Sequence, residues 1–220
     1  MPYKKRRPVR SGPFVRFQKK DSTAMKALKV AYNVRQLVNV EFKEINKALN
    51  TTIGTTANLQ LLNGCVKGSD QNDRVGQSIR IKSIENRSYA TYNASSGPNA
   101  QSVRRVIVLD LQPNQAAPSG GFSTIFEAIS TEPMIDLRNL NYKQRFVILK
   151  DDIVHLSANE PRKSFPDYYH KMNMHTTFVG TDTGTISDIA TGAIYAVFIA
   201  DHNTNPPALA SYSRIRFIDN

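Results

Sequence analysis

Short segments in which apolar and polar residues alternate recur along most of this chain, and stretches rich in Gly, Pro, Asn and Asp separate them. An alternation with a period of two predicts half-buried β-strands, and the residues between them supply turn dihedrals. With the other strand signals of the sequence, eight strand segments are expected, at residues 38–43, 59–62, 77–92, 103–111, 144–156, 167–178, 193–201 and 212–219. No strand–helix–strand alternation occurs, which argues against a parallel sheet. Eight strands with long connections predict an all-β jelly roll, in which two four-stranded antiparallel sheets pack face to face.

Three of these segments support more specific predictions. Within 77–92, the apolar parity changes between Ile81 and Ile84, which indicates a β-bulge or a strong bend. Residues 167–178 have one apolar and one polar parity, as expected for a strand with one buried face. Residues 193–201 are apolar on both parities and therefore fit the centre of a sheet.

The first strand and the longest connection also carry local signals. Three apolar residues alternate with three polar ones at 38–43, which predicts a half-buried strand. In the connection between the fourth and fifth strands, Thr124 and Glu127 have the spacing of a capping box. We therefore expect one short helix at residues 122–129.

Positive charge is concentrated at the N-terminal end. The chain has 29 Lys and Arg against 18 Asp and Glu, a formal net charge of +11. Residues 1–35 hold eleven of the basic residues and one acid, Asp21, so their net charge is +10. Residues 36–220 then hold 18 basic and 17 acidic residues, a net charge of +1. The sequence predicts a cationic arm, residues 1–37, joined to a nearly neutral jelly-roll domain, residues 38–220.

The first 20 residues predict a disordered arm that binds nucleic acid. They contain eight basic residues, three prolines and no acid, and they cannot bury enough apolar surface to fold alone. Cations along a flexible segment follow a phosphate backbone, and Tyr3, Phe14 and Phe17 offer rings that stack on unpaired bases. A solvated basic tail is the alternative, but this charge density at one terminus favours nucleic acid. The candidate nucleic-acid-binding residues are Lys4, Lys5, Arg6, Arg7, Arg10, Arg16, Lys19, Lys20, Lys26 and Lys29.

Residues 22–37 predict a basic amphipathic helix with Ser22 or Thr23 as its N-cap. Ala24, Ala27, Leu28, Ala31 and Val34 fall on one face, and Lys26, Lys29, Asn33 and Gln36 on the opposite one. We expect the apolar face to pack on protein and the basic face to meet a polyanion. A membrane-surface helix is less favoured because the apolar side is mostly alanine, and an ordinary solvated helix is the remaining alternative.

The cysteine and histidine content excludes several classes of protein. Cys65 alone permits neither an intrachain disulfide nor a multi-cysteine zinc site. The four histidines form no HxH or HExxH pair, which a cupin enzyme, itself a jelly roll, needs. They are His155, His170, His175 and His202. No nucleotide-binding or hydrolase motif occurs either, so we expect a protein that is not an enzyme.

No apolar stretch approaches the roughly 18 residues of a membrane span, and the N-terminal residues lack the apolar core of a signal peptide. We therefore expect a soluble protein made inside the cell, without a cofactor. One weak signal for a metal is present. The oxygen-rich pair Asp151 and Asp152, together with the loop at residues 70–73, is a candidate to bind calcium at subunit contacts. Strand-end and turn carboxylates without an ion are the stronger interpretation.

The order of the segments resembles a known family. A basic arm and a short helix precede VEFKEI, DRVGQSIRIKSI, RRVIVLDLQ, NLNYKQRFVILKDD, GAIYAVFIAD and a terminal RIRFIDN. In this order, over nearly the whole chain, they resemble the single jelly-roll capsid proteins of small circular single-stranded DNA (CRESS-DNA-type) viruses. The pattern is also similar to the coat protein of satellite tobacco necrosis virus. In such proteins the eight strands are lettered B to I, and a short helix usually lies between strands E and F.

The resemblance implies a capsid protein that assembles into a small icosahedral T=1 shell of about 60 copies and packages a single-stranded genome, DNA rather than RNA, through its arm. The loops expected at the fivefold vertex are residues 49–57, 93–102, 157–165 and 203–210. Those expected at the other end of the domain are residues 63–76, 112–143 and 179–192.

The resemblance further implies that subunits enter the host nucleus to meet the genome. Lys4, Lys5, Arg6 and Arg7 form a compact basic cluster in an accessible segment, the form that import receptors bind. Neutralisation of DNA alone would call for the same side chains. We expect both roles, with virion and nucleus as the locations.

A second function stays open at this point. A cellular β-domain with a basic tail, working as a monomer or small oligomer, would also bind nucleic acid. Such a module usually binds nucleic acid on its folded surface as well, whereas residues 36–220 are close to neutral. The division of charge therefore favours the capsid protein.

Overall fold

The computed structural model describes residues 22–37, 42–96, 99–127, 132–180 and 182–219. The chain divides into two compact units, residues 1–41 and residues 42–220. In the first unit the described part is one helix, α1, Thr23–Leu37, as the sequence predicted. None of the helices in the described ranges is long and apolar enough to cross a membrane.

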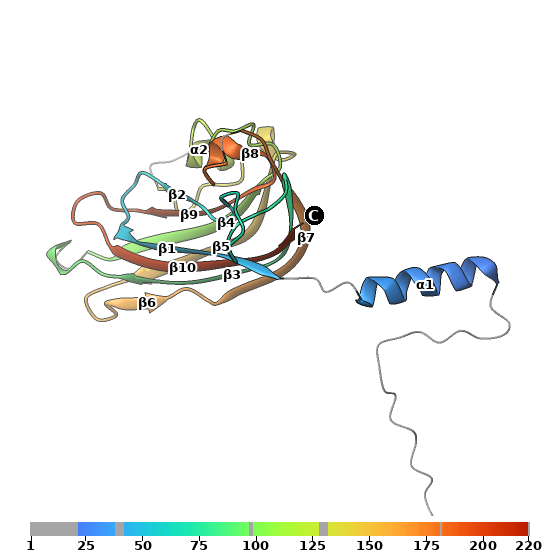
Figure 1. Cartoon of the computed structure of the whole chain (residues 1–220). Coiled ribbons are helices and arrows are strands. Elements are labelled where there is room, and N and C mark those ends of the chain that lie inside the picture. The colour runs from blue at the N-terminus through green and yellow to red at the C-terminus, as the bar shows by residue number, and fades with distance from the viewer. Residues whose placement is uncertain (1–21, 38–41, 97–98, 128–131, 181, 220) are drawn as a thin grey trace, which may run out of the picture. The chain divides into compact units, whose positions relative to one another are not determined.

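The second unit is built almost entirely of strands (Figure 1). These are β1 Lys43–Thr52, β2 Asn58–Leu61, β3 Ser78–Thr91, β4 Gln101–Asp110, β5 Phe146–Leu156, β6 Arg162–Ser164, β7 Tyr168–Phe178, β8 Ile189–Thr191, β9 Ala193–Ala200 and β10 Ala208–Asp219. Eight of them correspond to the expected strands. The other two, β6 and β8, have three residues each, too few to show an alternation.

Two antiparallel sheets form the two layers of this unit (Figure 1). One has the strand order β1-β10-β3-β7-β8, with β6 paired to β3, and the other has the order β2-β9-β4-β5. When the eight long strands are lettered B to I along the chain, these orders read B-I-D-G and C-H-E-F. Strands adjacent in a sheet are thus far apart in sequence, and the predicted eight-stranded jelly roll is confirmed.

The first strand lies later in the chain than the sequence indicated. Strand β1 begins at Lys43, and residues 38–41 lie outside the described residues. Phe42, expected on the buried face, is 59% exposed, whereas Lys43 and Ile45 are buried. The buried parity is therefore the opposite of the expected one, because continuous pairing with β10 sets which side chains face the core. The connection expected at 49–57 shortens accordingly to residues 53–57.

Other details of the strand pattern are confirmed. The register of β3 shifts around Lys82 against both β10 and β7, so a bulge brings Ile81 and Ile84 into the core together. Strand β9 is buried at every residue and lies between β2 and β4. Strand β7 buries Tyr168 and Phe178 on the expected parity.

The predicted short helix is present between β4 and β5 but is shorter than expected. Helix α2 spans Phe122–Ile125. The capping-box prediction is wrong. The Thr124 hydroxyl accepts from the backbone N–H of Gly120 at 3.0 Å, and the backbone N–H of Glu127 donates to the carbonyl of Leu137 at 2.8 Å. Glu127 is thus held by the returning chain instead of extending the helix.

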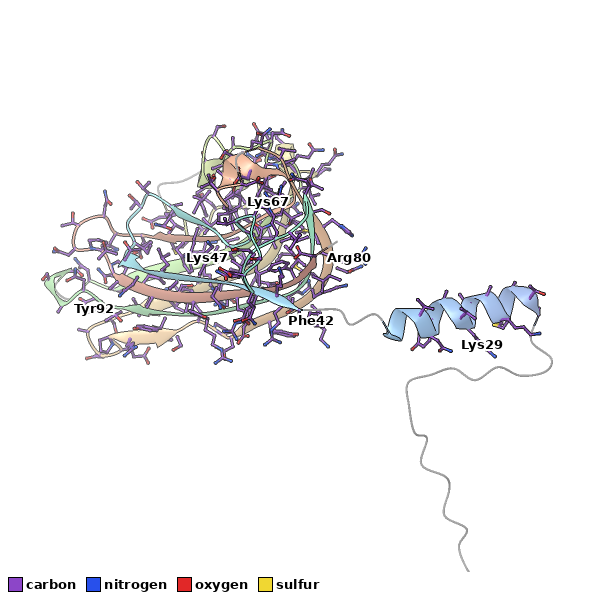
Figure 2. The ribbon with its side chains drawn as sticks, in the orientation of Figure 1. Lys29, Phe42, Lys47, Lys67, Arg80 and Tyr92 are labelled. Carbon is purple, nitrogen blue, oxygen red and sulfur yellow. The ribbon has the colours of Figure 1, made fainter. Side chains whose placement is uncertain are left out.

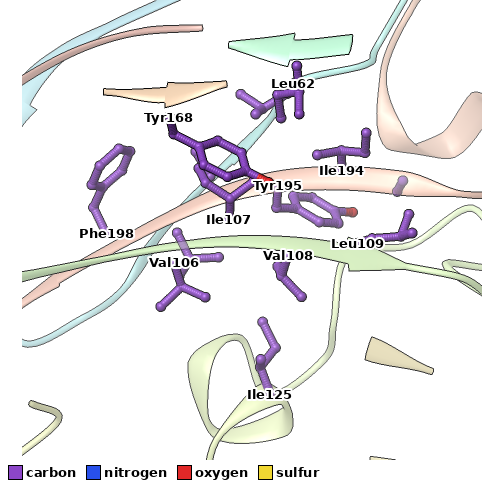
Figure 3. Close-up of a cluster of buried hydrophobic side chains, with 14 of the residues drawn as sticks. Leu62, Val106, Ile107, Val108, Leu109, Ile125, Tyr168, Ile194, Tyr195 and Phe198 are labelled. Carbon is purple, nitrogen blue, oxygen red and sulfur yellow. The ribbon is translucent and has the colours of Figure 1, made fainter. Parts of the chain in front are cut away.

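Strand β4 is buried on both faces (Figure 3). Ile107 points toward Tyr168 in the space between the sheets, and Val108 points to the other side, toward Ile125 of α2. The connection from β4 to β5 therefore covers the outward face of its sheet. Because both faces of β4 are covered, side chains on both faces are buried. Apolar and polar residues therefore alternate only weakly along this strand.

The connections gather at two opposite ends of the domain, as expected. At one end Gln101 Nε2 donates to the carbonyl of Asn205 at 2.7 Å, which ties the connection before β4 to that between β9 and β10. At the other end Arg74 forms an ion pair with Asp182, which ties the connection between β2 and β3 to that after β7. The assignment of the first group to a fivefold vertex stays a prediction.

A buried arginine connects the two sheets. Arg105 of β4 is fully buried, and its guanidinium donates to Oδ1 of Asn86 on β3 at 2.8 Å. It also donates to the carboxylate of Asp152 on β5 and to the carbonyl of Pro166 at 2.7 Å. The ring of Phe165 lies 4.8 Å from its Cζ. The positive charge is therefore neutralised and hydrogen-bonded inside the sandwich.

Small polar side chains make room for this arginine. Asn86 Nδ2 donates to the hydroxyls of Ser211 and Ser213 on β10, at 2.9 and 2.8 Å. The hydroxyl of Ser88 donates to Asn86 Oδ1 at 2.9 Å. These residues occupy inward positions that aliphatic side chains fill elsewhere on the same strands. The interior of the sandwich is thus a polar network enclosed by an apolar core.

We expect Arg105→Ala to lower the free energy of unfolding by about 3–5 kcal/mol, because the buried carboxylate of Asp152 then loses its arginine partner. Arg87→Ala is the matched control. Arg87 is 66% exposed in its ion pairs with Glu85 and Asp167, so its removal costs less than about 1 kcal/mol. Urea denaturation of unassembled subunits, followed by tyrosine fluorescence, measures both. Equal losses for the two variants would show that the buried network does not stabilise the fold.

Candidate nucleic-acid interface

Most of the predicted nucleic-acid-binding residues belong to the arm. Those in residues 1–21 lie outside the described residues, and they are Lys4, Lys5, Arg6, Arg7, Arg10, Arg16, Lys19 and Lys20. Lys26 and Lys29 lie on α1. The structure thus describes two of the ten candidates, and the roles of all ten stay predictions.

Helix α1 begins as the sequence indicated. The Ser22 hydroxyl accepts from the backbone N–H of Met25 at 3.3 Å, and the carbonyl of Ser22 accepts from Lys26 at 2.9 Å, so Ser22 is the N-cap. The apolar face is exposed, with Leu28 at 66% and Val34 at 52%. No acidic residue occurs in the first turn or elsewhere in the helix, so its charge is entirely positive.

A second cationic surface lies on the jelly-roll domain itself. On strands β1, β10, β3 and β7, six Lys and Arg side chains lie on the face that points away from the core. They are Arg80, Lys82, Arg87, Lys171, Arg214 and Arg216. The same face of these four described strands carries two carboxylates, Glu44 and Glu85, which leaves a net charge of six minus two, or +4. We call this surface the basic sheet face.

Side chains on the basic sheet face are arranged by contacts with their neighbours. Arg214 Nε donates to Asn46 Oδ1 at 2.8 Å and lies 3.4 Å from a carboxylate oxygen of Glu44. Arg80 Nε donates to Nε2 of His175 at 3.0 Å. Figure 2 shows Arg80 on the curved side of the domain, with its side chain directed outward. Side chains of neighbouring strands therefore hold Arg214 in place between β1 and β10, and Arg80 between β3 and β7.

The near-zero net charge of the domain does not reveal this surface, because a sum over the sequence takes no account of where the charges lie. Four arginines pair with aspartates at positions where at least one partner is buried. These pairs are Arg74 with Asp182, Arg104 with Asp151, Arg105 with Asp152, and Arg145 with Asp110. Each pair takes one base and one acid out of the sum together, so the remaining charges of the domain still sum to +1. The +4 of the basic sheet face is therefore offset by a net charge of +1 minus +4, or −3, elsewhere in residues 36–220.

The two aspartates considered for calcium are engaged by arginine. Arg104 Nε and Nη2 donate to the two carboxylate oxygens of Asp151, at 2.8 and 2.6 Å. Asp152 pairs with Arg105 and with Lys150, whose Nζ lies 3.0 Å from Oδ1. Among the described residues, no group of three or more His, Cys, Asp or Glu side chains could hold a metal ion. The geometry at these aspartates is that of ion pairs within the fold.

The histidines and the cysteine have structural contacts. His155 is 3.0 Å from the Ser102 hydroxyl, and His202 is 2.7 Å from Oδ1 of Asp201. Cys65 is buried, and its thiol donates to the carbonyl of Asn72 at 3.1 Å. Burial, reinforced by the nearby negative charge of Asp73, raises the pKa of the Cys65 thiol to about 11. The thiol is therefore protonated at neutral pH and is a poor nucleophile.

The comparison with protein-family models identifies the chain. None of the curated proteins matches it. Residues 2–220 match the model of the Geminivirus coat protein/nuclear export factor BR1 family. This match decides between the two functions left open above and excludes the cellular β-domain; the proteins of this family are structural and are not enzymes. The chain belongs to the Geminivirus coat protein/nuclear export factor BR1 family and is a viral capsid protein that packages a single-stranded DNA genome.

Proposed function

We propose that this capsid protein binds its genome through two cationic surfaces, the arm of residues 1–37 and the basic sheet face. The observation that carries the proposal is the sorting of charge. The arm has a net charge of +10 within residues 1–35, and the domain, although nearly neutral, places a net +4 on one sheet face. Cations that line one side of a shell subunit suit contact with packaged phosphates.

The copy number belongs to the same proposal. Identical chains closing with icosahedral symmetry give a smallest shell of about 60 copies. The arms would then supply on the order of 600 positive charges, enough to neutralise a substantial part of a small genome. Such a shell of 24.6 kDa subunits has a protein mass of about 1.5 MDa. Electron microscopy that shows joined or larger shells would contradict this number.

The similarity to the satellite tobacco necrosis virus coat protein stays a prediction.

We expect deletion of residues 1–20 to abolish packaging while the jelly-roll domain stays folded, because the deletion removes eight cations and no packed strand. The ratio of absorbance at 260 and 280 nm of purified particles measures the packaged DNA. A length-matched variant with all eight basic residues changed to Gln separates charge from chain length. If either variant packages as much DNA as the intact chain, the arm assignment is wrong.

The salt dependence of binding gives a second prediction. For the intact chain, with about eight phosphate contacts, the logarithm of the binding constant for single-stranded DNA should fall with the logarithm of the salt concentration at a slope near −6.

An exposed apolar segment supplies a candidate contact between subunits. In the connection from β4 to β5, Ile135, Leu137 and Leu140 are 69%, 68% and 65% exposed. Tyr142, in the same segment, is 44% exposed. Monomeric proteins rarely leave several large apolar side chains together in water, and such clusters mark interaction surfaces. In a self-assembling protein, a second copy of the chain is the partner that fits.

We expect the double substitution Leu137→Glu with Leu140→Glu to prevent particle formation, because it buries two carboxylates wherever this segment meets a neighbour. Both side chains are exposed in the single chain, so the fold itself should be retained. Sedimentation then shows slow species in place of particles. The control, Leu137→Met with Leu140→Met, keeps the apolar surface and should assemble. Normal particles from the Glu variant would remove this segment from the subunit contacts.

We also propose that Lys4, Lys5, Arg6 and Arg7 direct new subunits to the nucleus. The family name includes nuclear export factors, which supports passage of this chain across the nuclear envelope. Four consecutive basic residues suit the acidic grooves of import receptors. The same residues contribute four of the ten net charges of the arm, so they also bind DNA.

A fluorescent reporter too large for passive entry, fused to residues 1–35, should accumulate in nuclei. Changing the four residues Lys4, Lys5, Arg6 and Arg7 to Ala should leave the fusion in the cytoplasm, because the receptor loses its charged contacts. The matched control changes Arg10, Arg16, Lys19 and Lys20 to Ala, which removes the same charge from the arm. Equal nuclear entry of the two variants would show that net charge, and not the cluster, directs the protein.

A further inference from the structure

One hollow in the basic sheet face differs from the rest of that surface. It has a volume of about 510 Å³ and is lined by Phe42, Lys82, Ser83, Tyr169, Lys171 and Arg216. Three of these residues are cations, two are aromatic, and the lining includes no carboxylate. The volume lies within the roughly 300–1,000 Å³ of small-molecule sites. A neighbouring hollow on the same face, of about 360 Å³, includes Glu85 in its lining and therefore lacks this uniform charge.

The pairing of the strands explains why a hollow forms at this point. Ser83 of β3 is paired with Arg216 of β10 on one side and with Lys171 of β7 on the other. A short side chain thus lies in one row between two long cationic ones, and Ser83 itself is nearly buried, at 6% exposed. Ser83 therefore forms the bottom of the hollow, and Arg216 and Lys171 form its two sides.

The bulge in β3 supplies the third cation. Against β10, Lys82 is the extra residue of β3, and its side chain points outward beside Ser83. Against β7, the two residues Met172 and Asn173 lie opposite Lys82. Its Nζ donates to Oδ1 of Asn173 at 3.1 Å, which holds the amine at the hollow. Without the bulge, residues 82 and 83 would face opposite sides of the sheet. The bulge therefore builds the bottom of the hollow and adds a cation at the same time.

Two exposed rings complete the hollow. Phe42 is 59% exposed and Tyr169 is 54% exposed. Figure 2 shows Phe42 at the beginning of β1. Apolar rings left in water beside three cations suit a ligand that is both anionic and aromatic. A nucleotide of a single strand has this combination, because its phosphate attracts the cations and its unpaired base stacks on a ring.

We propose that this hollow is a nucleotide-binding site for the packaged single strand. Lys82, Lys171 and Arg216 hold a phosphodiester, and bases stack on Phe42 and Tyr169. The inference rests on the proposed role of the basic sheet face and adds a defined position at which each subunit fixes the strand. Binding there depends on bases as well as phosphates, whereas neutralisation by the arm depends chiefly on charge.

The test compares oligo-dT with an abasic oligonucleotide of the same length and charge, bound to the full-length protein. We expect the intact chain to bind oligo-dT about tenfold more tightly for each base that stacks in the hollow. Phe42→Ala with Tyr169→Ala should reduce this ratio by at least that factor and leave the salt dependence unchanged. Arg216→Gln should lower the salt slope by about 0.7 instead. Tyr212→Ala, which removes a ring from the neighbouring hollow, is the matched control and should change neither quantity.

The outcomes separate this site from the proposed function. If the ratio of oligo-dT to abasic binding is unchanged in Phe42→Ala with Tyr169→Ala, the site is refuted, while packaging through the arm can still be measured in the same particles. An equal loss of the ratio in Tyr212→Ala would also refute it. Photo-crosslinking of intact particles that contain 5-bromodeoxyuridine gives a second readout. We expect adducts on Phe42 or Tyr169, and adducts confined to residues 1–37 would overturn the proposal.

Discussion

The jelly roll of this capsid protein depends on a charge that is fully buried between its two sheets. Arg105 leaves β4, meets Asp152 beside it, and reaches Asn86 in the opposite sheet. A buried guanidinium is tolerated when its charge is neutralised and most of its donors are hydrogen-bonded, as both terminal nitrogens of Arg105 are, so polar and small side chains suit the positions around it. Ser211 and Ser213 meet that requirement on β10. Side chains from strands of both sheets are therefore fixed relative to one another by a single guanidinium.

The charge of the surface is distributed unevenly. Asp152, Asp151 and Asp110 pair with arginines within the fold, and because each pair removes one acid and one base, the balance of the other charges is unchanged. The outward face of the sheet β1-β10-β3-β7 retains its excess of Lys and Arg. The opposite sheet is covered by the connection between β4 and β5, whose exposed side chains include Ile135 and Leu137. One side of the subunit is thus suited to polyanion and another to protein.

Much of this architecture follows from local patterns in the sequence. The parts that could not be predicted were missed for one shared physical reason. Local patterns of apolar residues predicted seven of the eight long strands in place, including the buried strand β9, and the bulge near Lys82, because these depend on which side chains leave water. The parity of β1 was wrong because Phe42 is apolar yet exposed, and only pairing with β10 shows that Lys43 faces inward. The basic sheet face was missed for the same reason. It combines residues from strands that are adjacent in space but distant in sequence, and the acids that balance it lie elsewhere in residues 36–220.

Neutralisation of phosphates alone would not order a genome, since point charges bind any phosphate at any position. A rigid sheet acts differently. The row of Arg216, Ser83 and Lys171 has fixed spacings set by backbone pairing, and every subunit of a shell repeats it in the same orientation. In the proposed shell, a strand bound at such sites runs from one subunit to the next along paths set by the symmetry. In that proposal the arm and the sheet contribute different things: the arm supplies most of the charge, and the sheet supplies the geometry.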